Sequence, residues 1–220
     1  MSSALLDAPT ASAEAPSVHA TVPAAAPAAA PVPAAPKLAN PGPRGLAAFA
    51  LTTFVLSMFN SGLISNAALS AVVLPLALFY GGLAQFVAGL FEFRRGNTFA
   101  TTAFLSYGAF WMSFAAYVKF VVPGLPAADA HLATGLYLIA WFVFTLYMTV
   151  AAMKLDLAHK VVFVSLSLTF LFLALGDLTE STGLAHTGGF LGLLCAAAAW
   201  YTSFGVLTNE TWGRKVIPLG

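Results

Sequence analysis

This 220-residue sequence contains little charge and almost no cysteine. Asp, Glu, Lys and Arg together make up 8% of the residues, whereas 60% are hydrophobic, and the formal net charge is +1. This composition excludes an ordinary soluble domain, in which about a quarter of the residues are charged. It also argues against nucleic acid as a partner, because no basic patch is available to neutralise phosphates.

Cysteine and histidine are too few to suggest a metal or haem site. The single cysteine, Cys195, lies within a hydrophobic run, so we expect neither an intrachain disulfide nor a cysteine-based metal site. A bis-histidine haem protein would need histidines that face each other within helices, whereas the sequence pattern assigns all four to the tail or to loops: His19, His131, His159 and His186. The apolar runs also lack a nucleophile–base cluster, and we expect no enzyme, no cofactor and no metal.

Six long apolar runs dominate the rest of the chain. Each approaches the ~20 residues that a helix needs to cross about 30 Å of hydrocarbon. The runs cover residues 46–65, 70–91, 98–121, 132–152, 161–177 and 188–207. We therefore predict an all-α polytopic protein of the plasma membrane, with six transmembrane helices in a domain over residues 40–213 and with the lipid bilayer as its surroundings.

The basic residues are distributed asymmetrically between the connections of these runs. Only Lys119 falls on one side, and three acids, Asp129, Asp177 and Glu180, are assigned to the loops of that same side. The other side holds Lys37, Arg44, Arg94, Arg95, Lys154, Lys160, Arg214 and Lys215. By the positive-inside rule, both termini are predicted to face the cytoplasm.

The two ends of the chain differ from the apolar domain. Residues 1–39 consist almost entirely of Ala, Pro, Ser, Thr and Val. Closely spaced prolines break helices and small side chains bury little surface, so we predict a disordered cytoplasmic tail. Residues 214–220 are predicted to form a short C-terminal tail.

Three of the predicted helices carry stripes of polar residues. Helical spacing aligns Thr52, Thr53, Ser57 and Asn60 with Phe49 and Leu56 in the first run, Thr98, Thr102, Ser106, Ser113 and Tyr117 in the third, and Ser165 and Thr169 with Leu166 in the fifth. Two interpretations remain open. The stripes are either interhelical hydrogen bonds, worth about 0.6 kcal/mol each, or the wall of a wet, weakly polar path through the bundle.

The second and sixth runs instead carry faces of small residues. These faces predict close helix–helix contacts, either within one subunit or between subunits. They comprise Gly81, Ala84, Gln85, Ala88 and Glu92 in the second run, and Gly192, Cys195, Ala196, Ala199 and Ser203 in the sixth. Glu92 is expected to pair with Arg94 or Arg95 at the membrane interface.

Residues 40–46, Asn-Pro-Gly-Pro-Arg-Gly-Leu, mark the start of the first run. Asn is a good N-cap and Pro suits the first helical turn. Free N–H groups at this helix start could hold a small carboxylate. Plain helix capping explains the same residues, and geometry alone favours it.

This segment resembles the Asn-Pro-Ala-Pro-Leu-Gly-Leu signature of the acetate uptake transporter family, also called the succinate–acetate permease family. The resemblance extends in register over about 40–220. Gly42 replaces the usual Ala of the signature, and Arg44 replaces the usual Leu, which places a cation at the cytoplasmic mouth. Further similar segments are Phe79–Gln85, Gly96–Phe99, Ser106–Gly108 with Phe110 and Trp111, and Leu207–Arg214.

The resemblance implies a path for small monocarboxylates such as acetate through each subunit of a homo-hexamer. It implies an apolar constriction formed by Phe49, Tyr107 and Leu166, although Tyr107 lies one position off the polar stripe. The full set of expected substrate-binding residues is Asn40, Pro41, Phe49, Thr53, Asn60, Tyr107, Leu166 and Ala199. Channel-like conduction and proton-coupled symport remain open, as does transport of succinate, propionate or lactate. The alternative is a six-helix scaffold or receptor-like protein without transport activity.

Overall fold

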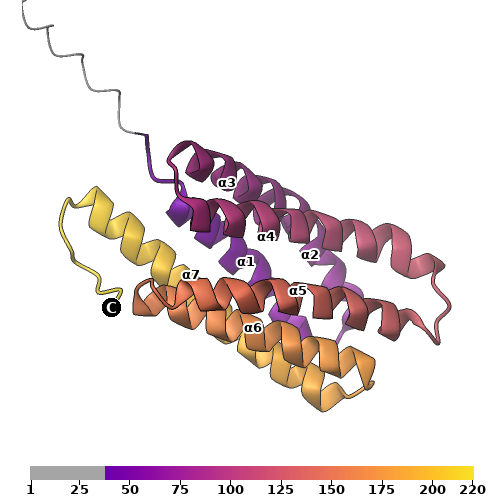
Figure 1. Ribbon diagram of the computed structural model, residues 1–220. Helices are drawn as coiled ribbons and strands as arrows, with labels where there is room; N and C mark the ends of the chain where they lie inside the picture. The colour runs from indigo at the N-terminus through magenta and orange to yellow at the C-terminus, as the bar shows by residue number, and fades with distance from the viewer. Residues whose placement is uncertain (1–37) are drawn as a thin grey trace, which may run out of the picture. The chain divides into compact units, whose positions relative to one another are not determined.

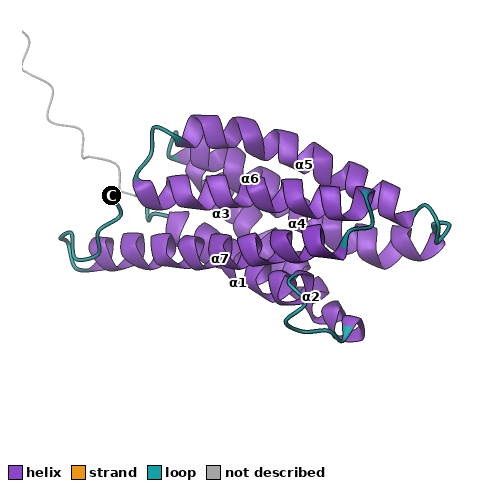
Figure 2. Ribbon diagram, turned by 90° about the horizontal axis from the view of Figure 1, so that it is seen from below, coloured by secondary structure: helices purple, strands orange, loops and turns teal. Residues whose placement is uncertain are grey.

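The computed structural model describes residues 38–220, which form helices joined by short connections (Figure 2). The predicted disorder of the tail falls almost wholly on residues 1–37 and so lies outside the described residues. Six helical spans of the described chain are long and apolar enough to cross a membrane: Gly42–Asn60, Ala68–Arg94, Thr98–Gly124, Ala130–Ala152, Leu157–Leu178 and Thr182–Thr211. The prediction of an all-α fold with six such helices is confirmed.

Four spans are single helices, and two are composite. The single helices are α1 (Gly42–Asn60), α5 (Ala130–Ala152), α6 (Leu157–Leu178) and α7 (Thr182–Thr211). The second span joins a 3₁₀ turn η1 (Ala67–Val72), α2 (Val73–Leu78), a π-helical turn η2 (Phe79–Ala84) and α3 (Gln85–Arg94). The third joins α4 (Thr98–Ala116), a π-helical turn η3 (Tyr117–Val121) and a 3₁₀ turn η4 (Val122–Gly124).

Helix ends follow local capping chemistry more closely than hydropathy. The first helix ends at Asn60, five residues before the predicted limit, because Gly62 adopts a φ of 76° that ends a helix readily. In contrast, α6 and α7 begin earlier than predicted and are therefore longer than their apolar runs. The carboxylate of Asp156 accepts the backbone N–H of His159 at 3.0 Å, and the Ser181 hydroxyl accepts that of Leu184 at 3.4 Å.

The assignment of the histidines to loops is wrong, because α5, α6 and α7 each begin before the predicted apolar run. His131, His159 and His186 all lie within helices, near the starts of α5, α6 and α7. His19 lies outside the described residues. Among residues 38–220, no group of three or more His, Cys, Asp or Glu side chains is arranged to hold a metal ion.

Packing contacts run around the bundle from α5 to α6, α7 and α1, and on through η2 and α3 to α4. The helices lie side by side and run in broadly the same direction (Figure 1). The small-residue faces provide these contacts within the chain: the backbone of Gly81 meets Thr52 on α1, and that of Gly192 meets Ser57. Small residues allow this close approach because helices in lipid associate through packing and not through hydrophobic drive.

Glu92 does not form the predicted pair with Arg94 or Arg95. Within residues 38–220 the only ion pair joins His159 to Asp156. The Glu92 side chain is 2% exposed, because it lies on the inner face of α3 against the start of α1. The two arginines extend from the exposed face of the helix end.

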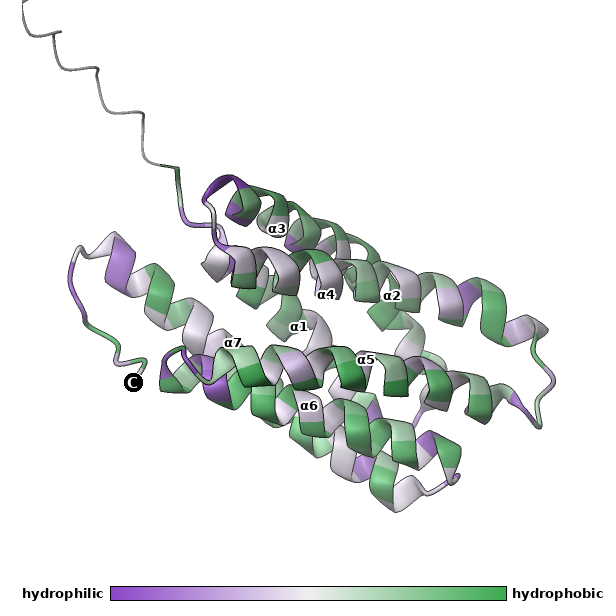
Figure 3. Cartoon of the chain, in the orientation of Figure 1, coloured by the Kyte–Doolittle hydropathy of each residue, from purple (hydrophilic) through white to green (hydrophobic). Residues whose placement is uncertain are grey.

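Hydrophilic residues gather at the two ends of the bundle, and apolar residues fill its length (Figure 3). The start of α1 and the C-terminus lie at the same end (Figure 1). We call this the basic end, because its described residues include Arg44, Arg94, Arg95, Lys154, Lys160, Arg214 and Lys215. Lys119 lies at the opposite end. That the basic end faces the cytoplasm stays a prediction.

Cysteine labelling would test this orientation. Lys119 and Lys154 are both exposed, at opposite ends of the bundle, and the native Cys195 is buried. In intact cells, a membrane-impermeant maleimide should label Lys119→Cys and leave Lys154→Cys unlabelled, because the positive-inside rule places Lys154 in the cytoplasm. Labelling of both after permeabilisation is the control. The reverse pattern in intact cells would overturn the orientation.

Candidate transport pathway

Two cavities lie inside the bundle, one toward each end. Cavity 1, about 200 Å³, reaches Asn97 and Asp156 at the basic end. Cavity 2, about 360 Å³, reaches Asn60 and Asp177 at the opposite end. Phe49 and Leu166 line both cavities and separate them.

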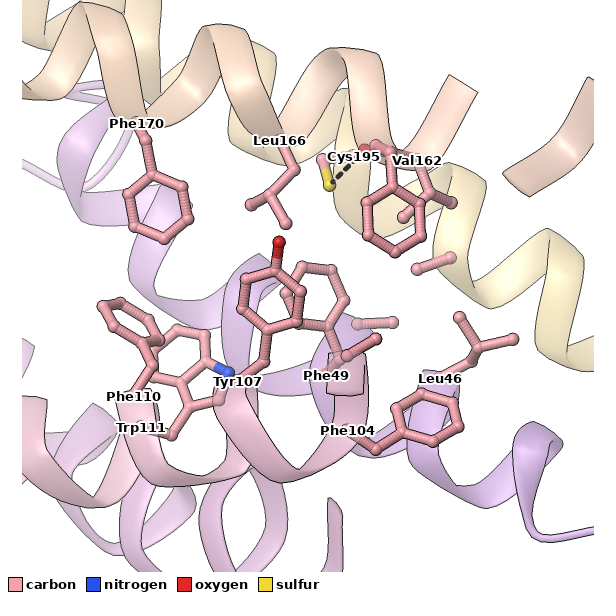
Figure 4. Packing of buried hydrophobic residues seen from close by; sticks show 14 of the residues in the cluster. Leu46, Phe49, Phe104, Tyr107, Phe110, Trp111, Val162, Leu166, Phe170 and Cys195 are labelled. Atoms are coloured by element: carbon pink, nitrogen blue, oxygen red, sulfur yellow. Dashed lines mark hydrogen bonds between the residues drawn. The ribbon is translucent and has the colours of Figure 1, made fainter. Parts of the chain in front are cut away.

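The boundary between the cavities is a ring of three side chains from three helices, which we call the waist. Phe49 on α1, Tyr107 on α4 and Leu166 on α6 point toward one another (Figure 4). Each is 3–4% exposed, and the ring centroids of Phe49 and Tyr107 lie 6.0 Å apart. The structure thus brings together the three residues expected to form the constriction.

Tyr107 is held in place by neighbours on α5 and α6. Its hydroxyl donates to Thr145 Oγ1 at 3.0 Å, and its ring meets Phe144 edge-on at 5.3 Å between centroids. Phe163 packs on it from α6. The buried Thr145 was missed in the sequence, where α5 shows no polar stripe and its only signal is the density of aromatic residues.

Cavity 1 has apolar walls with a few polar groups. Gln85 is 1% exposed, and its Oε1 has no hydrogen-bond partner among the described residues. His159 Nδ1 lies 2.8 Å from Asp156 Oδ1, so an imidazole–carboxylate pair stands at the basic end of the cavity. The sequence pattern placed Gln85 on a packing face only, and it gave no sign that Asp156 and His159 form a pair.

Cavity 2 is larger, and aromatic side chains from several helices form part of its wall. Its walls include Phe110, Trp111, Phe114, Tyr117, Tyr137 and Phe170. The expected residues Thr53 and Asn60 line it, and Thr53 Oγ1 is buried without a hydrogen-bond partner in the described chain. Buried polar atoms normally have a partner, so Thr53 is a candidate for contact with a solute or water.

The polar stripes divide between the two interpretations. On α1 and α6, Thr53, Ser57, Asn60 and Thr169 line cavity 2, which fits a path. Thr52, by contrast, donates to the Ala48 carbonyl at 3.0 Å and packs on η2. Of the polar stripe in the third span, only Tyr117 lines cavity 2. The other four residues of this stripe line neither cavity: Thr98, Thr102, Ser106 and Ser113.

The Asn-Pro motif links the start of α1 to α7 through hydrogen bonds. We call this set of contacts the clasp. Asn40 Oδ1 accepts the backbone N–H of Gly42 at 3.0 Å, while its Nδ2 donates to Glu210 Oε1 at 2.5 Å. Pro41 is buried at the N-cap position of α1, and the Ser203 hydroxyl donates to the Pro43 carbonyl at 2.6 Å. Neither Asn40 nor Pro41 lines cavity 1 or 2, so their contact with substrate stays a prediction.

Two further features lie outside the walls of the two cavities. Ala199 is fully buried on α7, on the face shared with Cys195. Residues 213–220 fold back on the bundle: the Asn209 amide donates to the Ile217 carbonyl at 2.8 Å, and the Leu219 carbonyl accepts from Ala158 N at 2.9 Å. The predicted C-terminal tail is therefore tied to the start of α6.

Asn40→Ala should lower the stability of the purified protein by about 1–2 kcal/mol, because it removes the acceptor of the Gly42 N–H at the start of α1 and a hydrogen bond to the Glu210 carboxylate. The thermal unfolding midpoint in mild detergent measures this loss. Arg44→Ala, at an exposed site in the same segment, is the matched control and should unfold like the wild type. An unchanged midpoint in Asn40→Ala would show that the clasp contributes nothing.

Comparison with known proteins agrees with this architecture. The succinate-acetate/proton symporter SatP of Escherichia coli (strain K12) is 42% identical over 184 residues, which span 84% of this chain and 96% of that protein. Acetate permease A of Emericella nidulans is 38% identical over 201 residues, covering 83% of this chain and 66% of the permease. The solved structure of the bacterial acetate channel SatP matches with a TM-score of 0.77 at 41% identity, covering 84% of this chain and all of that one.

The resemblance drawn from the motifs is confirmed by a family model. The model of the GPR1/FUN34/yaaH family matches residues 23–218. The match includes the clasp, the waist and both cavities, with only its first residues outside the described part of the chain. This chain belongs to the GPR1/FUN34/yaaH family.

Proposed function

We propose that this protein is a transporter or channel of the plasma membrane that passes acetate and related short-chain carboxylates across the waist. The observation that carries the proposal is the pair of cavities, which approach from opposite ends of the bundle and meet at Phe49 and Leu166. The names of the relatives point to the same solutes.

The chemistry of the path suits a small monocarboxylate. Acetate has one methyl group, which the apolar waist accommodates, and one carboxyl group. Burying an ionised carboxylate costs far more than burying its neutral form, so the waist favours passage of the acid, or of an anion that keeps hydrogen bonds on either side. Gln85 in cavity 1 and Thr53 in cavity 2 each carry a polar oxygen without a protein partner in the described chain.

The remaining site residues take supporting roles in this proposal. Asn60 lines cavity 2 near its mouth, whereas Asn40 and Pro41 fix the start of α1 at the basic end. Ala199 is fully buried on α7 and lines neither cavity. We assign no catalytic role to any of these residues.

We further propose a homo-hexamer. Large apolar side chains project from the outer faces of α2–α3 and α7, where they can meet lipid or a second copy. These include Phe79, Leu83, Phe93, Phe190 and Phe204. Light scattering of the detergent-solubilised protein measures the mass of the assembly.

Uptake of radiolabelled acetate into proteoliposomes that contain only this protein tests the proposal. We expect uptake well above that of empty vesicles, whereas equal uptake would favour the scaffold interpretation.

Electrical recording across a pH gradient then separates the two modes of transport. If the current reverses at the acetate equilibrium potential at every pH gradient, the protein is a channel. If the reversal potential shifts with the pH gradient, transport is coupled to protons.

A further inference from the structure

Asp177 occupies a position that the sequence did not suggest. It was expected in an outer loop, but it lies in the last turn of α6, half-buried in the wall of cavity 2. Its side chain also borders the adjoining groove at that end of the bundle. Of the described residues that line cavity 2, Asp177 alone is an aspartate, glutamate, lysine or arginine.

The ionisable neighbours of Asp177 come from three directions. His131 faces the same groove from α5, His186 faces it from α7, and Glu180 follows on the chain after α6. The cavity wall adds the phenols of Tyr117 and Tyr137, and α1 contributes the uncharged Asn60. Within residues 38–220, no basic group lies within 4.0 Å of the Asp177 carboxylate, because the only ion pair is that of His159 with Asp156.

The two cavities therefore differ in charge. In cavity 1, the carboxylate of Asp156 has an imidazole partner at 2.8 Å. In cavity 2, Asp177 has none at ion-pair distance, and Glu180, in the adjoining groove, does not line the cavity. An anion on the path thus meets an unpaired negative charge on one side of the waist only.

We propose that Asp177 selects substrates by charge, favouring monocarboxylates over dicarboxylates in cavity 2. The inference rests on the proposed function and adds to it the residue that sets the charge limit. Coulomb repulsion scales with the product of the charges. The free energy of repulsion from Asp177 is therefore about twice as large for a dianion as for a monoanion. Because a rate depends exponentially on free energy, the factor by which repulsion slows uptake of the dianion is the square of that for the monoanion.

The test compares initial uptake of radiolabelled acetate and succinate by proteoliposomes at about pH 7.5, where carboxyl groups are ionised. Asp177→Asn should raise acetate uptake about fivefold and succinate uptake about 25-fold, as the doubled charge requires. The succinate-to-acetate ratio then rises about fivefold. This ratio is independent of the amount of active protein, and Asp177→Ser provides a second neutral variant if Asp177→Asn fails to fold.

Two matched variants keep the interpretation specific. Asp177→Glu retains the charge, and Glu180→Gln removes a charge from the groove without touching cavity 2, so both should keep the wild-type ratio. A wild-type ratio in Asp177→Asn and Asp177→Ser would overturn the inference, as would an equal rise in Glu180→Gln. Acetate uptake by the wild-type protein tests the proposed function, and its absence would refute that function. The succinate-to-acetate ratio of the variants tests the role of Asp177 separately.

Discussion

Leu166→Ala should retain acetate transport and gain transport of a larger carboxylate such as lactate. Leu166 lines both cavities and closes the waist opposite Phe49 and Tyr107. Truncation to alanine removes three carbons from this ring. Apolar sites discriminate one methylene by only about 1–3 kcal/mol, so we expect the lactate-to-acetate uptake ratio to rise by tenfold or more.

Leu168→Ala is the matched control for this widening. Leu168 is a leucine of the same helix, but its side chain is 38% exposed and faces away from both cavities. Its truncation should leave the ratio unchanged. The competing view treats Leu166 as a core leucine, whose truncation costs about 2–5 kcal/mol of stability and brings no new substrate. An unchanged ratio in folded Leu166→Ala would remove it from the path.

Gly189→Ala should prevent stable folding, although it adds a single methyl group. The Cβ of an alanine at this position of α7 would overlap backbone atoms of Asn60 and Ser61 at the end of α1. Backbone cannot rotate away as a side chain can, so the two helices would have to separate. We expect a loss of about 3 kcal/mol or more, measured as a lower unfolding midpoint and a loss of monodisperse protein in detergent.

Gly183→Ala, in the same helix, is the control for Gly189→Ala. The nearest atom to a Cβ at Gly183 is Ser181 Oγ at 4.0 Å, so the added methyl meets open space. Alanine is also a better helix former than glycine by up to about 1 kcal/mol. Wild-type or slightly higher stability is expected. Similar stability of the two variants would show that the contact between α1 and α7 is malleable.

Much of the fold was predictable because lipid imposes strong constraints on sequence. A helix that crosses a membrane must be long and apolar, and all six spans stand out for this reason. Their ends were less predictable. Capping by Asp156 and Ser181 extends α6 and α7 beyond the apolar runs, and Gly62 ends α1 early. Hydropathy does not register such local hydrogen bonds and backbone conformations.

The site was predictable only in part. Helical spacing placed Thr53, Asn60 and Leu166 on faces that do line the cavities, and the resemblance to the family supplied Tyr107. Spacing could not show which neighbour each face meets. The place of Asp177 in the wall of cavity 2 depends on how α6 packs in the bundle, so the sequence pattern assigned this residue to a loop.

If the two cavities form one solute path, a solute that enters either cavity must pass the waist, and a single thiol placed there tests this passage. Leu166→Cys in a Cys195→Ala background would carry the only cysteine of the chain. A small thiol-reactive methanethiosulfonate should then block acetate uptake by the proteoliposomes, and excess acetate should slow the block, because solute and reagent occupy the same waist. Unchanged uptake after complete modification of the introduced thiol would show that acetate does not pass the waist.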